Sequence, residues 1–182
     1  MNALFVSIAH ILGSLGGTLY PEDLASRALV DELLASIEDV FGIVLPYHFE
    51  QDADKKKELA KGVKADDKLP YWIKKIEKRL AENEARGNKN GFFVGDALTV
   101  GDLKVYTAME FIDYALADID LGEQLKPVPK LTAFMKKIDA MDKIQEFKAM
   151  FKEQQEKSPA PTQVDPAVTE HMVKGKNVYI EM

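Results

Sequence analysis

A complete helix start lies in the stretch Gly91-Phe92-Phe93-Val94-Gly95-Asp96-Ala97-Leu98-Thr99-Val100-Gly101-Asp102-Leu103. Thr99 falls at the N-cap position, where its hydroxyl can accept the backbone N–H of Asp102. Asp102 can reach back to the N–H of Thr99, and Leu98 and Leu103 occupy the two positions of a hydrophobic staple. A capping box alone is typical of any well-capped helix, whereas the whole string is more specific.

Apolar residues at helical spacing predict further helices on both sides of this stretch. The expected helices cover residues 3–13, Pro21 to Pro46, Pro70 to Arg86, Val100 to Leu116, and two shorter segments that start near Leu131 and Ile144. Pro46 is expected to end the second of them. The stretch from Glu50 to Lys68 is highly charged and is expected to be a solvated loop or a surface helix. Because no internal repeat and no clear sheet region is present, the predicted fold class is an all-α bundle.

The composition restricts the classes of function. The chain has 182 residues, of which 46% are hydrophobic, and this is enough for one globular domain with a sizeable core. A net charge of −6 argues against nucleic acid or anionic lipid as the main partner. The chain has no cysteine, which excludes disulfides, thiolate nucleophiles and cysteine-based metal sites.

The first residues give an expectation about location. Met1 to Gly13 lacks a basic region and is interrupted by His10, so we expect no signal peptide. No segment of the sequence is long enough to span a membrane. We therefore expect a cytoplasmic or organelle-matrix protein that is not secreted, and removal of a transit peptide from a longer precursor stays open.

No residue pattern indicates catalytic, metal or cofactor chemistry. His10, His48 and His171 lie far apart and lack the spacing of paired metal ligands. The glycine-rich run from Gly13 to Gly17 lacks the lysine and the preceding strand of a phosphate-binding loop, and we interpret it as a linker. Asp102 is interpreted as a buried folding element rather than a general base. We therefore assign no catalytic, cofactor-binding or metal-binding residue.

Several landmarks, in order along the chain, resemble the C-terminal helical domain of the cytosolic glutathione transferases. They are Ala28-Leu29-Val30-Asp31, Leu69-Pro70-Tyr71-Trp72, Phe93-Val94-Gly95-Asp96, Leu98-Thr99-Val100-Gly101-Asp102-Leu103, Pro129-Lys130-Leu131-Thr132-Ala133-Phe134 and Lys143-Ile144-Gln145-Glu146-Phe147. The resemblance covers residues 18–151 and is to the alpha, pi and sigma group, with a sigma-like chain preferred. Where that family has a proline before the final helix, this chain has Asp142, which can act as an N-cap instead.

The resemblance implies a division of the chain into three parts. In that family a thioredoxin-like domain precedes the helical domain and supplies the catalytic Tyr or Ser and most contacts to glutathione, and we expect it to be lacking here. Residues 1–17 are expected to be its last helix and a linker, and residues 18–156 the helical domain. Residues 157–182, which include the linker-like run Ser158-Pro159-Ala160-Pro161-Thr162, are expected to form an irregular, extended tail.

The resemblance also places the family's glutathione-binding positions on residues that cannot bind glutathione. The family's acidic residue or Gln aligns with Leu4, and the Ser that follows it aligns with Phe5. The Asp that the family's partner subunit contributes aligns with Ala35. These side chains offer neither a charge nor a hydrogen bond. We therefore predict that the chain has no intact glutathione site. A shifted alignment leaves a role for Ser7 open, although a lone serine lacks the rest of the site.

Two functions follow from the resemblance. Without a thioredoxin-like domain, an apolar face of the bundle would be exposed, and such a patch favours a partner. The residues expected to form this interface or a hydrophobic pocket are Phe5, Ile8, Val30, Leu34, Ile37 and Phe41. The first function is a non-catalytic interaction or scaffold module in a homodimer or larger assembly. The alternative is part of a glutathione transferase, in which this chain supplies the hydrophobic co-substrate pocket beside a thioredoxin-like domain and glutathione is the cofactor.

Overall fold

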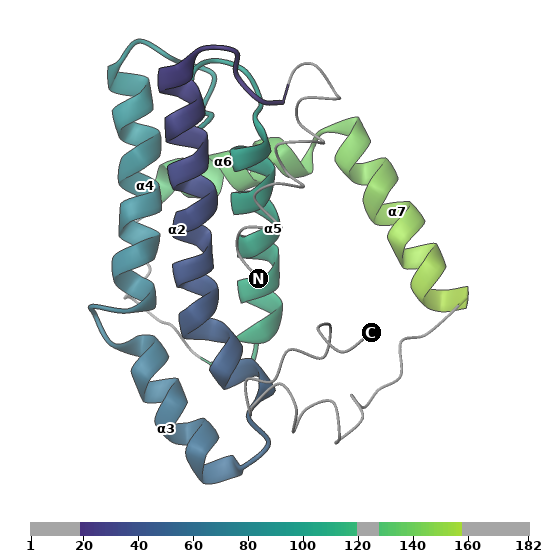
Figure 1. Cartoon of the computed structure of the whole chain (residues 1–182). Helices are drawn as coiled ribbons and strands as arrows, with labels where there is room; N and C mark the ends of the chain where they lie inside the picture. The colour runs from purple at the N-terminus through teal and green to yellow at the C-terminus, as the bar shows by residue number, and fades with distance from the viewer. Residues whose placement is uncertain (1–18, 120–127, 158–182) are drawn as a thin grey trace, which may run out of the picture. The chain divides into compact units, whose positions relative to one another are not determined.

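The computed structural model describes residues 19–119 and 128–157, and all regular secondary structure within these ranges is helical (Figure 1). The chain falls into two units, one ending at Ile138 and the other beginning at Asp139. The helices are α2 (Leu24–Phe49), α3 (Ala53–Lys64), α4 (Leu69–Ala85), α5 (Val100–Ala115), α6 (Pro129–Asp139) and α7 (Asp142–Lys157). The predicted all-α fold class is confirmed. The helix expected over residues 3–13 and the tail expected from residue 157 lie outside the described residues, apart from Lys157 itself.

Helix α2 begins and ends about three residues further toward the C-terminus than the sequence predicts. Its N-cap is Asp23, whose carboxylate accepts the N–H of Ser26 at 2.8 Å. The prediction that Pro46 ends the helix is wrong, because Pro46 lies inside the last turn and the helix ends at Phe49. A proline removes the hydrogen bond to the carbonyl four residues earlier, here that of Gly42. Gly42 is exposed, so its carbonyl can bond to water instead.

Helix α3 occupies most of the charged stretch between α2 and α4. Its N-cap is Asp52, whose carboxylate accepts the N–H groups of Asp54 at 3.0 Å and Lys55 at 2.9 Å. Val63 is its buried residue, and its remaining side chains are half-buried or exposed. Of the two expectations for this stretch, the surface helix is therefore the one observed.

Helices α2, α4 and α5 supply most of the core of the first unit. In Figure 1, α2 lies beside α5 and also contacts α4 and α3. The buried residues follow the helical spacing predicted from the sequence: Val30, Leu33, Leu34, Ile37, Val40 and Val44 in α2, Ile73, Ile76 and Leu80 in α4, and Val105, Ala108, Met109, Ile112 and Ala115 in α5. A Cβ atom added to Gly101 would lie 3.0 Å from Cδ2 of Leu33. Glycine at this position therefore allows α5 to begin close against α2.

The first turn of α6 is held by a side chain from α4. Glu77 accepts the N–H of Lys130 at 3.0 Å through Oε1 and the N–H of Leu131 at 2.7 Å through Oε2. N–H groups in the first turn of a helix have no partner within the helix, so both bonds satisfy donors that would otherwise be unpaired. Further along α6, the ring of Phe134 packs edge-on against Phe93, with centroids 4.9 Å apart. Helix α6 is thus attached to α4 and to the loop that precedes α5.

The second unit contains α7 and is described by itself. Asp142 is the first residue of α7, and the carbonyl of Met141 accepts the first helical N–H groups, so Asp142 is not the N-cap that the sequence predicts. Lys148 forms an ion pair with Asp139 at 2.5 Å. Phe147 in this helix is 56% exposed. The second unit begins inside the predicted helical domain of residues 18–156, whose boundaries stay predictions.

The cap that Glu77 provides gives the first prediction. Glu77→Ala leaves two first-turn donors of α6 without their carboxylate, and we expect a loss of about 2 kcal/mol in the free energy of unfolding. Urea denaturation of wild type and variant measures the loss. Glu82→Ala is the matched control, because Glu82 on the same helix forms only a surface ion pair with Lys78 at 3.5 Å, worth about 0.5 kcal/mol or less. If both variants lose the same free energy of unfolding, Glu77 does not stabilise α6 by capping its first turn.

Candidate functional site

Asp102 is fully buried at the start of α5, and its carboxylate holds two segments together. Oδ2 accepts the N–H of Thr99 at 2.7 Å and lies 2.6 Å from the Thr99 hydroxyl, while Oδ1 accepts the N–H of Phe93 at 2.8 Å. The Thr99 hydroxyl accepts the N–H of Asp102 at 3.4 Å, so both bonds of the capping box are present. Leu98 and Leu103, at the staple positions, are half-buried.

The environment of Asp102 fits a structural role. Burial raises the pKa of this carboxyl group above its ordinary value, and the hydrogen bonds from Thr99 and Phe93 oppose that shift. The residue has no exposed surface, and both carboxylate oxygens are used by partners within the fold. Asp102 therefore starts α5 and fixes the preceding loop, and it has no access to a substrate.

A second buried polar residue, Asn83, fixes the same loop from α4. Its Nδ2 donates to the carbonyls of Phe92 and Gly95, each at 2.9 Å, and its Oδ1 accepts the N–H of Gly95 at 3.2 Å and an amide N–H of Asn88 at 3.0 Å. Asn83 was not among the functional or structural residues predicted from the sequence. A signal was present, because Asn83 continues the helical spacing of the buried residues Ile76 and Leu80.

The residues predicted to form an interface or hydrophobic pocket fall in different places. Val30, Leu34 and Ile37 are buried in the core of the bundle, so they are unavailable to a partner, and neither pocket described below is lined by them. Helix α2 packs against α5, α3 and α4, and these three side chains lie on its buried side. Phe41 is half-buried. Phe5 and Ile8, together with Leu4, lie outside the described residues.

Five aromatic side chains gather where α2 and α5 adjoin, and we name this group the aromatic cluster. Its members are Phe41, His48, Phe49, Phe111 and Tyr114. The rings of Phe41 and Phe111 meet edge to face at 5.7 Å, and the imidazole of His48 lies 5.4 Å from the Phe111 ring. Tyr114 is 72% exposed and Phe49 50% exposed. The cluster is therefore an apolar surface that solvent can reach.

Helices α2 and α4 together carry a charged face, which we define as Glu32, Ala35, Asp39, Tyr71, Lys75 and Lys78. All of these residues are exposed. A two-pronged ion pair between Glu32 and Arg79, with N–O distances of 3.1 and 2.9 Å, brings the two helices side by side. The ammonium of Lys75 lies over the ring of Tyr71 at 5.0 Å. The charged face therefore carries acidic groups on α2 and basic groups on α4.

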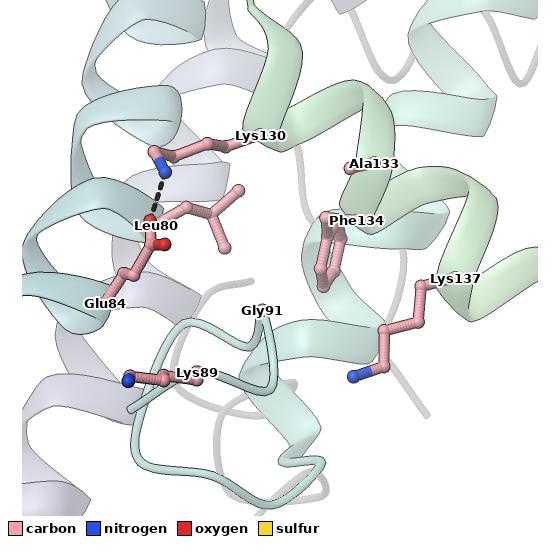
Figure 2. A pocket seen from close by; sticks show the side chains of 8 residues that line it. All are labelled: Leu80, Glu84, Lys89, Gly91, Lys130, Ala133, Phe134 and Lys137. Carbon is pink, nitrogen blue, oxygen red and sulfur yellow. Dashed lines mark hydrogen bonds and ion pairs between the residues drawn. The ribbon is translucent and has the colours of Figure 1, made fainter. Parts of the chain in front are cut away.

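A small pocket lies between α4, α6 and the loop before α5 (Figure 2), and we name it the lysine pocket. Its volume is about 200 Å³, and its lining residues are Leu80, Glu84, Lys89, Gly91, Lys130, Ala133, Phe134 and Lys137. The buried side chains of Leu80 and Phe134 form the apolar wall. Lys130 forms an ion pair with Glu84, and Lys137 donates to the carbonyl of Asn90. No residue pattern in the sequence indicated this pocket.

A wider and more open hollow shares Ala133 with the lysine pocket. It has a volume of about 380 Å³ and is lined by Val128, Pro129, Thr132, Ala133 and Lys136. Within residues 19–119 and 128–157, no group of three or more His, Asp or Glu side chains is placed to hold a metal ion. No helix in that part of the chain combines the length and the apolar character needed to cross a membrane.

Comparison with known proteins identifies the family. Residues 38–150 match the family described as "Glutathione S-transferase, C-terminal domain", and the chain belongs to this family. Glutathione S-transferase 3 of the chicken, Gallus gallus, is 30% identical over 149 residues. That match covers 79% of this chain and 58% of the chicken protein, so the chain spans little more than half the length of this relative.

Two solved structures with the same fold come from an insect and a hookworm. Prostaglandin synthase D of Nilaparvata lugens superposes with a TM-score of 0.63 at 20% identity, over 85% of this chain and 68% of that one. The structure described as monomeric Na-GST-3, a glutathione S-transferase from the hookworm Necator americanus, gives a TM-score of 0.59 at 16% identity, over 86% of this chain and 69% of that one. At these identities the likeness extends to the fold alone.

The geometry of Asp102 gives a prediction for stability. Asp102→Ala removes the capping box and leaves the buried N–H of Phe93 unpaired, so we expect a loss of about 3 kcal/mol in the free energy of unfolding. Asp96→Ala is the control, because Asp96 in the same loop is exposed and accepts the N–H of Asn90 at 3.2 Å. Thermal or urea unfolding measures both. A smaller loss for Asp102→Ala than for the control would contradict the assigned role.

The raised pKa of Asp102 gives a prediction for pH dependence. The folded state keeps this proton to a higher pH than the unfolded state, whose pKa is near 3.8. The stabilisation from protonation is fully present below pH 3.8 and is lost as the pH rises through the folded-state pKa. The advantage of wild type over Asp102→Asn in unfolding free energy should therefore shrink as the pH rises from 3.8 toward neutral. An advantage that grows with pH would show that the pKa is lowered instead.

Proposed function

We propose that this chain is a non-catalytic interaction module, which pairs with a second copy of itself or joins a larger assembly. The observation that carries the proposal is the charged face, where acidic groups of α2 and basic groups of α4 share one exposed surface. A two-fold dimer brings the same surface of both copies together. Asp39 of one copy can then face Lys75 and Lys78 of the other, so the surface is complementary to itself.

Aromatic surface strengthens this proposal. Tyr71 is 44% exposed, and Trp72 beside it is half-buried, with the two rings 5.7 Å apart. Tyrosine, tryptophan and arginine are the residues that most often anchor protein interfaces. The similar hookworm transferase is described as monomeric, so the proposed pairing rests on these side chains and not on the fold.

The chemistry of α2 favours a non-catalytic role. Ala35, the position that the family resemblance assigns to a glutathione-binding Asp, is exposed on α2 and offers only a methyl group. An ammonium group gains neither charge nor hydrogen bond there. The charged face is thus suited to contact another protein surface rather than glutathione.

Charge reversal tests the pairing. We expect wild type to be a dimer by light scattering at low ionic strength and Lys75→Glu with Lys78→Glu to weaken the dimer by at least roughly tenfold, because like charges then face each other. Adding Asp39→Lys to that variant should restore part of the affinity. Lys57→Glu with Lys61→Glu on α3 is the matched control and should leave the dimer intact. Two outcomes would argue against pairing through the charged face. One is that the purified wild-type chain is a monomer, and the other is that both double variants change the dimer affinity equally.

The alternative is that the chain supplies the hydrophobic co-substrate pocket of a glutathione transferase beside a thioredoxin-like domain. The aromatic cluster favours this alternative, because it is an accessible apolar surface that a second domain could cover. The cluster differs from the residues first expected, since only Phe41 belongs to both sets. In this case the activity would require both the second domain and glutathione.

An activity assay separates the two functions. We expect the purified chain not to be retained on immobilised glutathione and not to conjugate chlorodinitrobenzene, because Ala35 cannot bind the ammonium group of glutathione. Clear turnover of chlorodinitrobenzene by the chain alone would contradict the non-catalytic proposal. Turnover that appears only on addition of a thioredoxin-like domain, and that Phe111→Ala reduces, would establish the alternative.

A further inference from the structure

We propose that the lysine pocket binds a small carboxylate with an apolar, ring-sized body. The proposal is independent of the interaction function, because the pocket lies on α4, α6 and the loop between α4 and α5, and shares no residue with the charged face or the aromatic cluster. Figure 2 shows the two parts of the site, an apolar wall and a basic rim.

The charges at the rim favour an anion. The lining of the pocket includes three lysines, Lys89, Lys130 and Lys137, and one carboxylate, Glu84, which leaves a formal excess of two positive charges. The chain as a whole carries a net charge of −6, so the pocket is a basic spot on an acidic protein. Lys130 is paired with Glu84, but an ammonium has three donors and can bind a second acceptor. Hydrogen bonds from an ammonium to a carboxylate are among the stronger ones in proteins.

The wall of the pocket favours an apolar body on that anion. Leu80 and Phe134 are buried side chains that line the pocket, and the lining that they contribute is carbon. Ala133 on α6 and Gly91 on the loop add no bulk to the lining. A volume of about 200 Å³ is below that of pockets for drug-sized molecules, which begin near about 300 Å³. A benzoate-sized ligand therefore suits the site better than a peptide or a nucleotide.

The elements that surround the pocket are fixed in advance of binding. Glu77 holds the first turn of α6, which carries Lys130. The loop that carries Lys89 and Gly91 is tied to α4 by Asn83. The ammonium of Lys137 lies 4.0 Å from the centroid of the Phe92 ring. Binding would therefore require little reordering of backbone, and this is the condition under which a small ligand can bind measurably.

Titration of the full-length chain with three probes tests the proposal. Benzoate carries both the charge and the ring, benzamide lacks the charge, and acetate lacks the ring. At constant ionic strength, amide shifts in a ¹H–¹⁵N spectrum should move for Gly91, Lys130 and Ala133 on addition of benzoate, with a dissociation constant on the order of 1 mM or tighter. Benzamide and acetate should each bind roughly tenfold more weakly or worse.

Three variants locate the site. Lys137→Met should weaken benzoate binding roughly tenfold, whereas Lys136→Met, on the adjacent residue that lines only the wider hollow, should leave it unchanged. Glu84→Gln removes the competing carboxylate and should tighten binding several-fold. Glu84 is exposed, so this variant keeps the fold and decides the matter even if Lys137→Met does not fold. Equal binding of benzoate and benzamide, shifts confined to other parts of the chain, or no tightening in Glu84→Gln would overturn the proposal.

Discussion

The described bundle depends on one buried carboxylate, that of Asp102. It accepts hydrogen bonds from the N–H and the hydroxyl of Thr99, the N-cap of α5, and through the N–H of Phe93 it fixes the loop that leads into this helix. Removing a carboxylate from water is costly, and the hydrogen bonds to both oxygens offset part of that cost, because burial still leaves the pKa of Asp102 raised. The helix start and the loop conformation are therefore a single unit, and neither can rearrange without leaving Asp102 or its donors unpaired.

Asn83 and Glu77 apply the same principle to the loop before α5 and to the start of α6. Asn83 ties the loop to α4, and Glu77 ties α6 to α4, so polar side chains on one helix set the positions of two neighbouring segments. Apolar packing among α2, α4 and α5 supplies the core but is not directional. The polar anchors supply direction, and they place α6 so that the lysine pocket lies beside α4.

The fold was predictable from sequence to a large extent, and the candidate sites were not. The capping stretch and the helical spacing identified the fold class, because both are local patterns that a helix requires. The predicted end of α2 at Pro46 was wrong, because the last turn of a helix at the surface tolerates the loss of one backbone hydrogen bond. Val30, Leu34 and Ile37 were expected at an interface or a hydrophobic pocket and are buried in the described chain. Sequence periodicity cannot say which neighbour covers an apolar stripe. The lysine pocket joins residues from Leu80 to Lys137 that only the packing of α6 brings together.

The cap on α6 has a consequence for the order in which the bundle assembles. Glu77 lies 53 residues before the N–H of Lys130 that it binds. A helix with a local N-cap can gain that stabilisation while the rest of the chain is unfolded, but α6 gains it only after α4 has formed and the two helices have met. Helix α6 is therefore a late element of folding. The lysine pocket, which α6 completes, exists only in the assembled bundle, so a ligand bound there would report on the folded population of the chain.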